Sequence, residues 1–176
     1  QHVVEGLVSR RTVHVNLGDR AYDVLIDAAG PGGVAAPLVD RLGVREVAVL
    51  TDSNVGPLYG DEVLTALRQA GCRAEMLTLG VGEHHKVVDS AEQAWRWLLD
   101  RGYDRRAVVL ALGGGVVGDL AGFVASTWMR GVDLVAAPTS LLAQVDSSVG
   151  GKTGFNLLGA KNIVGTFHQP RLVFAS

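Results

Sequence analysis

The stretch ALGGGVVGDLAG, residues 111–122, places three consecutive glycines directly after an apolar run. Glycines at this position let the backbone turn sharply and come close to a ligand. A helix beginning near Gly118 would point free N–H groups at that turn, which favours an anion. Gly113, Gly115 and Gly118 also fit the G-x-G-x-x-G pattern, but Asp133, the acid nearest the usual spacing of about 20 residues, starts the next apolar run. We therefore predict a phosphate-binding turn that differs from the common dinucleotide-binding one.

The rest of the chain alternates between strand-like and helix-like patterns. Apolar runs predict buried strands, and the amphipathic segments between them predict helices. This alternation is typical of a parallel sheet with helices on both faces, so we predict an α/β, Rossmann-like fold with an N-terminal β-hairpin. The hairpin is expected at 12–26, strands at 46–51, 73–79, 107–112, 132–138 and 171–176, and helices at 34–43, 57–71, 90–102, 118–129 and 139–148.

One of these helices has a recognisable start. Ser90 and Gln93 form the S-x-x-Q pattern of a capping box, which predicts that the helix begins at Ser90. Trp95, Leu98 and Leu99 are expected to form its apolar stripe against the core.

The composition limits the class of protein. With 176 residues, 48% hydrophobic and 19% charged, the chain is expected to form one domain over 1–176. A net charge of −2 without a Lys/Arg block argues against nucleic acid as a partner. The single cysteine, Cys72, excludes an internal disulfide and a Cys-rich zinc site. No run approaches the length of a membrane span and no signal-peptide pattern is seen, so we expect a cytoplasmic domain without a membrane partner.

Two downstream segments carry candidate anion-binding groups. In DSSVGGKTG, residues 146–154, Asp146 could hold a hydroxyl and Lys152 a phosphate or carboxylate. The segment is not a P-loop, because Asp146 stands where the first glycine is required. Lys161 and Asn162 add a charge and an amide nearby. Taken singly, these residues could be solvated loop positions, but together they favour one anion site.

Three other segments follow strands or a helix. Asp52 and Asn54 come just after a predicted strand, where α/β sheets bind ligands, although an Asx turn is an alternative. Glu83 could accept ribose hydroxyls, and Lys86 could reach a phosphate. Arg130 ends a predicted helix, where it either complements the helix dipole or contacts a phosphate.

These segments together resemble the 3-dehydroquinate synthase family. The similar stretches are GGGVVGDLAGFVASTWMRG, APTSLLAQVDSSVGGKTGFN and KNIVGTFHQP, in the same order and at the same separations. TDSNVGPLY and GEHHK resemble the family's upstream nucleotide-binding segments, and the resemblance covers most of 46–175.

The resemblance implies an enzyme of the shikimate pathway that uses NAD and a divalent metal, zinc or cobalt. This enzyme, a homodimer, converts the sugar phosphate 3-deoxy-D-arabino-heptulosonate 7-phosphate into 3-dehydroquinate and phosphate. Transient oxidation of a ring hydroxyl permits phosphate elimination before the hydride returns. The family's metal ligands lie in a helical C-terminal domain that this chain lacks. The resemblance therefore implies an N-terminal NAD-binding half, inactive alone, with no metal ligand of its own. Alternatives are another sugar-phosphate cyclase, of the valiolone or inosose type, and a non-catalytic NAD-binding module.

The resemblance also assigns roles to individual residues. Asp119 is further expected to cap the following helix or to accept a hydrogen bond at the NAD site. Alanine at position 160 replaces the family's glycine and would be strained in a left-handed conformation. Substrate contacts carried over are Asp146, Lys152, Asn162 and, across a dimer, Arg130. Cofactor contacts are Asp52, Asn54, Glu83, Lys86, Gly114, Gly115, Val116, Val117, Gly118, Asp119, Thr139, Ser140 (threonine in the family) and Lys161.

Overall fold

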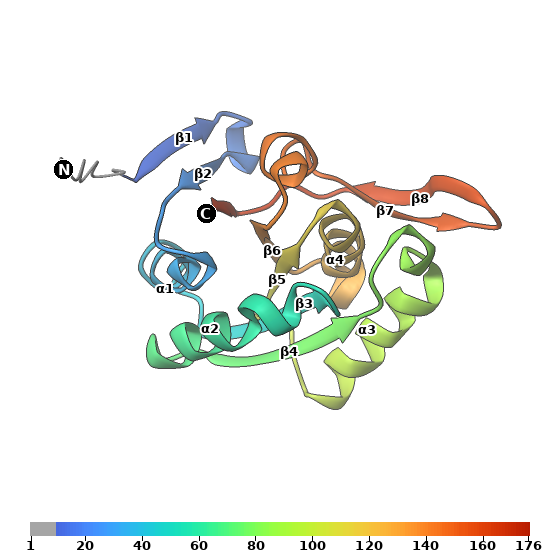
Figure 1. The fold of residues 1–176 in the computed structure, drawn as a ribbon, viewed down its shortest axis with the longest axis horizontal. Helices are drawn as coiled ribbons and strands as arrows, with labels where there is room; N and C mark the ends of the chain where they lie inside the picture. Colours follow the sequence, from blue (N-terminus) through green and yellow to red (C-terminus); the bar gives the residue numbers. More distant parts are fainter. Residues whose placement is uncertain (1–9) are drawn as a thin grey trace, which may run out of the picture.

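The main sheet of the computed structural model, which describes residues 10–176, has seven strands in the order β1-β2-β9-β6-β5-β3-β4 (Figure 1). Only the β1–β2 pair is antiparallel, and it forms the hairpin predicted at the N-terminal end. The strands are β1 Arg11–Val15, β2 Tyr22–Ile26, β3 Glu46–Asp52, β4 Arg73–Leu79, β5 Val108–Gly113, β6 Asp133–Pro138 and β9 Leu172–Ala175.

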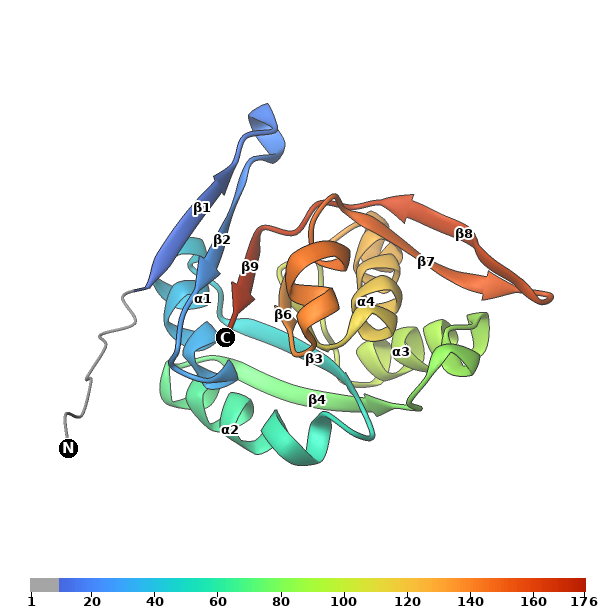
Figure 2. The same cartoon turned by 45° about the horizontal axis from the view of Figure 1, so that its top comes forward.

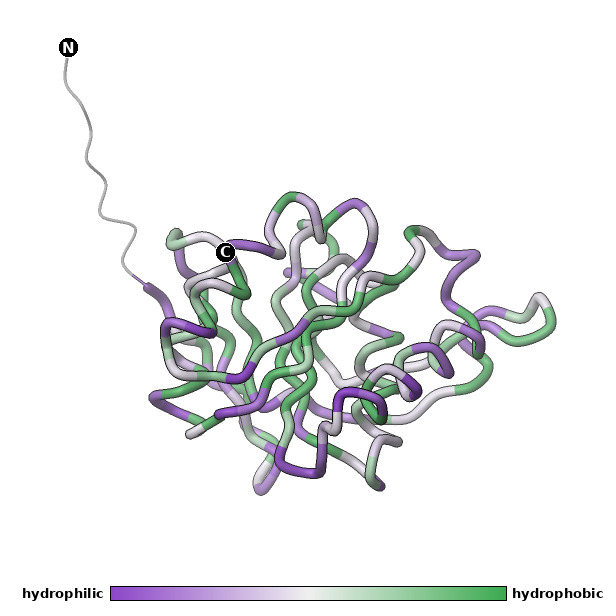
Figure 3. The backbone as a smooth tube through the Cα atoms, turned by 90° about the horizontal axis from the view of Figure 1, so that it is seen from below, coloured by the Kyte–Doolittle hydropathy of each residue, from purple (hydrophilic) through white to green (hydrophobic). Residues whose placement is uncertain are grey.

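Four α-helices cover the two faces of this sheet. Alternate residues of β3 divide between two cores: Val47 and Val49 face α1 and α2, whereas Ala48 and Leu50 face α3 and α4. Figure 3 shows the hydrophobic segments gathered in the middle of the fold, as expected for strands buried on both sides. The predicted Rossmann-like arrangement is confirmed. The helices are α1 Ala35–Leu42, α2 Gly56–Gln69, α3 Val88–Asp100 and α4 Gly115–Thr127.

The strand order creates a switch point between β3 and β5. From β3 the chain crosses through α2 to β4 at one edge, and from β5 it crosses through α4 to β6 on the other side. The connections therefore diverge, and a crevice is left outside the carboxyl ends of β3 and β5. Asp52 ends β3 and Gly113 ends β5, so both flank this crevice.

A second, two-stranded sheet lies alongside α4 (Figure 2). It consists of β7 Lys152–Leu157 and β8 Ala160–Phe167, a hairpin that the sequence analysis treated as loop and polar turn. Phe155 packs edge-on against Phe123 of α4 at 5.0 Å between ring centroids. The hairpin is thereby fixed to the helix that follows the glycine turn.

Three local predictions are wrong. Helix α4 begins at Gly115 rather than near Gly118, so the glycines belong to its N-terminus. Helix α3 begins at Val88 and has no side-chain cap. Ser90 is not the cap, because Val88 and Asp89 already belong to the helix, and its side chain is buried in the first turn. Leu99 is 66% exposed, because the core-facing side of α3 is already occupied by small residues and Leu98.

Two other expectations need comment. Ala160 does not adopt a left-handed conformation, so it carries no strain from that source; Gly159, at φ 82°, makes the turn instead. Cys72 is buried, and burial raises the pKa of its thiol. The predicted domain of 1–176 also includes residues 1–9, which lie outside the described residues.

Gly165→Ala is expected to destabilise the protein by about 1–3 kcal/mol, because overpacking between two backbones cannot relax easily. A Cβ atom at Gly165 would lie 2.1 Å from the backbone oxygen of Thr153 in β7. The free energy of unfolding in urea checks this. Gly118→Ala is the control, because a Cβ atom at Gly118 meets nothing within 4 Å and should stabilise α4 by up to ~1 kcal/mol. Equal effects of the two substitutions would contradict the packing described for the hairpin.

Candidate active site

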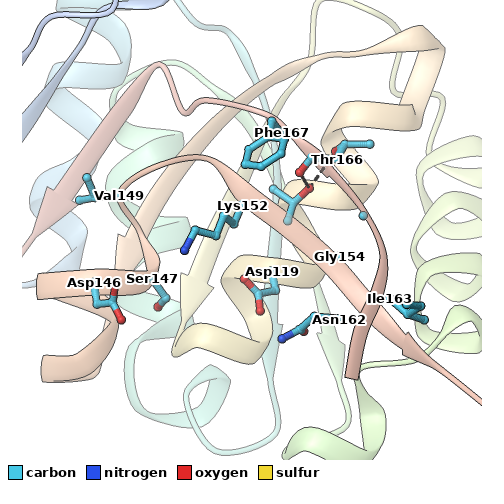
Figure 4. Close-up of a pocket in the computed structure, with 12 residues that line it drawn as sticks. Asp119, Asp146, Ser147, Val149, Lys152, Gly154, Asn162, Ile163, Thr166 and Phe167 are labelled. Atoms are coloured by element: carbon cyan, nitrogen blue, oxygen red, sulfur yellow. Dashed lines mark hydrogen bonds between the residues drawn. The ribbon is translucent and has the colours of Figure 1, made fainter. Parts of the chain in front are cut away.

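A cavity of about 460 Å³ lies between α4, the helical turn Ala143–Ser147 and the β7–β8 hairpin. It brings together four predicted site residues that are far apart in the sequence: Asp119, Asp146, Lys152 and Asn162. Figure 4 shows the Lys152 side chain extending toward the end of the cavity where Ser147 and Asp146 lie. The complete lining is Asp119, Asp146, Ser147, Val149, Lys152, Thr153, Gly154, Asn162, Ile163, Gly165, Thr166 and Phe167.

Close packing explains two of the three consecutive glycines beside this cavity. A Cβ atom at Gly113 would lie 2.7 Å from the Val117 side chain, and one at Gly115 would lie 3.2 Å from the Ser147 hydroxyl. Gly114 is the N-cap of α4, and no side chain caps that helix. The first N–H groups of α4 therefore lack a side-chain partner, and they lie at the carboxyl end of β5, the kind of helix N-terminus that favours an anion.

The end of β6 borders the same turn. The Thr139 N–H group donates a 3.0 Å hydrogen bond to the Gly113 carbonyl. The Ser140 hydroxyl accepts a 3.3 Å hydrogen bond from the Ala143 N–H group. It also lies close to Gly114, where an added Cβ atom would be 3.6 Å from the Ser140 oxygen. Both hydroxyl residues predicted as cofactor contacts thus lie next to the glycine turn. Val117 is buried, so only its backbone could contact a ligand there.

A buried ion pair links the predicted cofactor segment to α4. The Lys86 ammonium lies 2.9 Å from Asp119 Oδ2 and 3.4 Å from Glu83 Oε1, and Lys86 is only 4% exposed. Burial raises the pKa of Asp119, although the hydrogen bond from Lys86 opposes the shift. The expectation that Asp119 caps α4 is wrong, because it lies within the helix and accepts its hydrogen bond from Lys86.

Asn156 of β7 completes this polar group, although the sequence analysis did not single it out. Its side-chain amide donates a 2.9 Å hydrogen bond to Glu83 Oε1, and its carbonyl oxygen accepts a 2.8 Å bond from the Asn162 N–H group. The bond from Asn156, with a further contribution from Lys86, lowers the pKa of Glu83. These contacts arise from the tertiary placement of β7, and no clear hairpin signal marks that strand in the sequence.

Asp52 adopts the Asx turn that the sequence analysis kept as an alternative. Its Oδ1 atom accepts hydrogen bonds of 2.9 Å from the N–H groups of Asn54 and Val55, just before α2. These bonds fix the loop between β3 and α2, whose N-cap is Val55 and which has no side-chain cap of its own. A nucleotide contact by Asp52 or the exposed Asn54 stays a prediction.

Two basic residues of the predicted site lie outside the cavity lining. Arg130 follows the far end of α4 and is exposed, in a turn where Met129, Arg130 and Gly131 all have positive φ. Lys161 is exposed on β8, where its charge also acts on Glu83. The structure therefore does not bring Arg130 to the cavity of its own chain.

Among residues 10–176, no group of three or more His, Cys, Asp or Glu side chains is placed to hold a metal ion. No helix in the described part of the chain is long and apolar enough to cross a bilayer.

Comparison with known proteins identifies the family. Residues 76–176 match the family model described as 3-dehydroquinate synthase N-terminal. The 3-dehydroquinate synthases of Rhizobium etli and Ruegeria pomeroyi are 50% and 52% identical over 168 and 171 residues, each covering 94% of this chain. The chain belongs to the 3-dehydroquinate synthase family. It spans 44% and 45% of the length of these two relatives.

Solved structures of sugar-phosphate cyclases have the same architecture. A 2-deoxy-scyllo-inosose synthase complexed with carbaglucose-6-phosphate, NAD+ and Co2+ matches with a TM-score of 0.87 and 26% identity, over 94% of this chain and 46% of that one. The 2-epi-5-epi-valiolone synthase of Streptomyces hygroscopicus, with NAD+ and Zn2+ bound, matches with a TM-score of 0.79 and 28% identity. The match covers 92% of this chain and 44% of that one. A probable glycerol dehydrogenase of Sinorhizobium meliloti shares the fold, with a TM-score of 0.67 at 19% identity over 86% and 38%.

Lys86→Met is expected to cost about 1–3 kcal/mol of stability at neutral pH, because Asp119 keeps a largely buried charge without its partner. Loss of Lys86 also raises the pKa of Asp119 further above its ordinary value of 3.8. An acid with a raised folded-state pKa binds its proton in the folded state first, so the deficit should shrink as the pH falls toward that ordinary value.

Urea unfolding at several pH values measures this effect. Arg105→Met is the control, because Arg105 is exposed, has no ion pair among residues 10–176 and does not act on Asp119. A deficit for Lys86→Met that grows on acidification would show that the pair does not hold Asp119 in its charged form.

Proposed function

We propose that the chain is the NAD-binding part of a 3-dehydroquinate synthase. The reaction converts 3-deoxy-D-arabino-heptulosonate 7-phosphate into 3-dehydroquinate and phosphate. One observation carries the proposal: Lys152, Asn162 and two carboxylates share a cavity beside the uncapped N-terminus of α4. A phosphorylated polyol needs these groups, because cations and amides bind its phosphate and carboxylates accept hydrogen bonds from its hydroxyls.

The glycine turn fits the pyrophosphate of NAD. Backbone N–H groups of 114–118 would hold it, because α4 has no capping side chain and a Cβ atom at Gly115 would crowd the turn. The turn also lies at the switch point of the sheet. NAD+ bound there would accept a hydride and return it. Further contacts to the cofactor are proposed for Asp52, Asn54, Glu83, Lys86, Asp119, Thr139, Ser140 and Lys161.

The chain's own residues would bind and orient the sugar phosphate. Lys152 is exposed on the first position of β7 and faces the cavity, so its ammonium can meet a phosphate without first breaking an ion pair. Asn162 can donate from its side-chain amide, and Asp146 can accept a hydroxyl hydrogen. Asp119 is already engaged with Lys86, so this pair fixes the floor of the site rather than binding phosphate.

Other features of the family are proposed for the complete protein. The metal ion and its ligands would come from outside the described residues, as would further substrate contacts. Arg130 would act in a homodimer, where it could reach the phosphate site of the second copy. We place the protein in the cytoplasm, with the sugar phosphate rather than nucleic acid or a membrane as its partner.

An inosose-type cyclase is the second candidate, because the inosose synthase structure matches with a TM-score of 0.87. The sequence relatives favour the first candidate: 3-dehydroquinate synthases reach 50–52% identity, against 26% for the inosose synthase. Glucose 6-phosphate separates the two, since its carbocyclic analogue is the compound bound in the inosose synthase structure.

Phosphate release from 3-deoxy-D-arabino-heptulosonate 7-phosphate tests the proposal, with the protein expressed from its own gene. We expect release that requires NAD+, and no turnover of glucose 6-phosphate. Lys152→Ala should lower kcat/KM by about a hundredfold, because a charge-assisted contact to the phosphate is lost. Arg105→Ala, an exposed cation before β5, should stay within about twofold.

Two results would contradict the proposal. One is a protein that neither binds NAD+ nor releases phosphate. The other is an equal response to Lys152→Ala and Arg105→Ala, which would mean that the cavity does not bind the substrate. Preferred turnover of glucose 6-phosphate would support the second candidate instead.

A further inference from the structure

Asn156 joins two segments of the chain through its side-chain amide and its backbone N–H group. Its side-chain amide donates to Glu83, at 2.9 Å to Oε1 and 3.4 Å to the backbone oxygen. Its side-chain oxygen accepts from the Asn162 N–H group at 2.8 Å, and its backbone N–H donates to the Lys86 carbonyl at 2.8 Å. Position 156 also forms an isolated parallel bridge with Val87. This half-buried residue is therefore a joint between the Glu83–Lys86 segment and β8.

The joint lies at an irregularity of the hairpin. Phe155 pairs with Val164 and Leu157 pairs with Ala160, so Asn156 alone faces the three residues 161–163 of β8. The extra residues let Asn162 adopt a left-handed conformation, at φ 52°, which asparagine tolerates better than most residues. Its N–H group has left the strand ladder and is held by the Asn156 side chain instead. The orientation of Asn162 thus depends on Asn156.

The other end of the joint returns to the same cavity. Glu83, held by Asn156, also contacts Lys86, and Lys86 contacts Asp119. Asp119 and Asn162 both line the cavity, so the polar chain starts and ends there. A displacement of the Glu83–Lys86 segment would therefore be transmitted to Asn162 through a single side chain.

We propose that Asn156 is a positioning residue, through which the Glu83–Lys86 segment sets the geometry of Asn162 and hence the affinity of the cavity for a phosphate group. The inference rests on the proposed function, which places the substrate phosphate at Asn162. The side-chain amide of Asn156 donates to Glu83 through its nitrogen and accepts from Asn162 through its oxygen at the same time. Aspartate keeps the acceptor but sets a second carboxylate against Glu83, and alanine removes both contacts.

The charges around Glu83 determine the pH at which the positioning role of Asn156 can be tested. Lys86 faces Glu83 from its own segment, and Lys161 acts on it from β8. Asp119 of α4 lies beyond Lys86, with the charge of Lys152 acting on it from β7. His84 and His85 belong to the same turn as Glu83. Two adjacent carboxylates share a proton more readily than either binds one alone, so acid should restore a donor in the aspartate variant.

The test compares Asn156→Asp and Asn156→Ala in the NAD+-loaded protein, with inorganic phosphate as the probe in calorimetric titrations. The affinity of each variant for phosphate is divided by that of the wild-type protein at the same pH. Asn156→Ala should bind about tenfold more weakly at every pH, because a contact that orders the site is lost. Asn156→Asp should be about tenfold weaker near pH 8 and recover most of this loss near pH 5. Asn16→Asp, in the distant turn after β1, is the matched control and should change nothing.

Amide hydrogen exchange of Asn162 supplies a readout that needs no ligand. We expect faster exchange in Asn156→Ala than in wild type, because the acceptor is removed, and near-normal exchange in Asn156→Asp. The proposal is overturned if both variants bind phosphate within twofold of wild type, or if the loss in Asn156→Asp is independent of pH. Wild-type protein that binds no phosphate contradicts the proposed function, and unchanged Asn162 exchange in Asn156→Ala then contradicts the positioning role separately.

Discussion

The turn from β5 into α4 is the constraint on which the rest of the site depends. Gly113 and Gly115 are needed because Val117 and Ser147 occupy the space of their missing side chains. The turn in this way ends β5 at the switch point of the sheet and leaves the first N–H groups of α4 without a capping side chain. Backbone dipoles supply the positive potential there, so the loop itself needs no lysine.

The cationic groups lie instead on an element attached to α4. The β7–β8 hairpin packs on that helix through Phe155, and it carries Lys152 and Asn162 to the open side of the cavity. Beneath them, Lys86 and Asp119 form a buried pair that joins the Glu83–Lys86 segment to the same helix. One helix therefore aligns two segments that are widely separated in the sequence, and this alignment contributes to the mixed charge of the cavity.

The sequence predicts the strands and helices of the sheet well, because each carries a strong local pattern. It also identifies Asp119, Asp146, Lys152 and Asn162, which the structure brings into one cavity. The β7–β8 hairpin was not predicted, because glycines and an irregular register weaken the alternation of apolar and polar residues along its strands. Asn156 was therefore not identified either. For Asp119 the helix-cap alternative is wrong, because its partner, Lys86, is distant in the sequence, and a contact at the NAD site stays a prediction. Such contacts depend on tertiary packing rather than on local propensity.

The central claim is that the N-terminus of α4 binds the pyrophosphate of NAD. Backbone amide chemical shifts, measured while NAD+ is added to the isotope-labelled protein, test it most directly. We predict that the amides of Gly115, Val116 and Val117 shift most, together with Thr139 at the end of β6, because these groups face the proposed pyrophosphate. Saturating NAD+ that shifts other amides but leaves those of Gly115–Val117 unchanged would contradict the account.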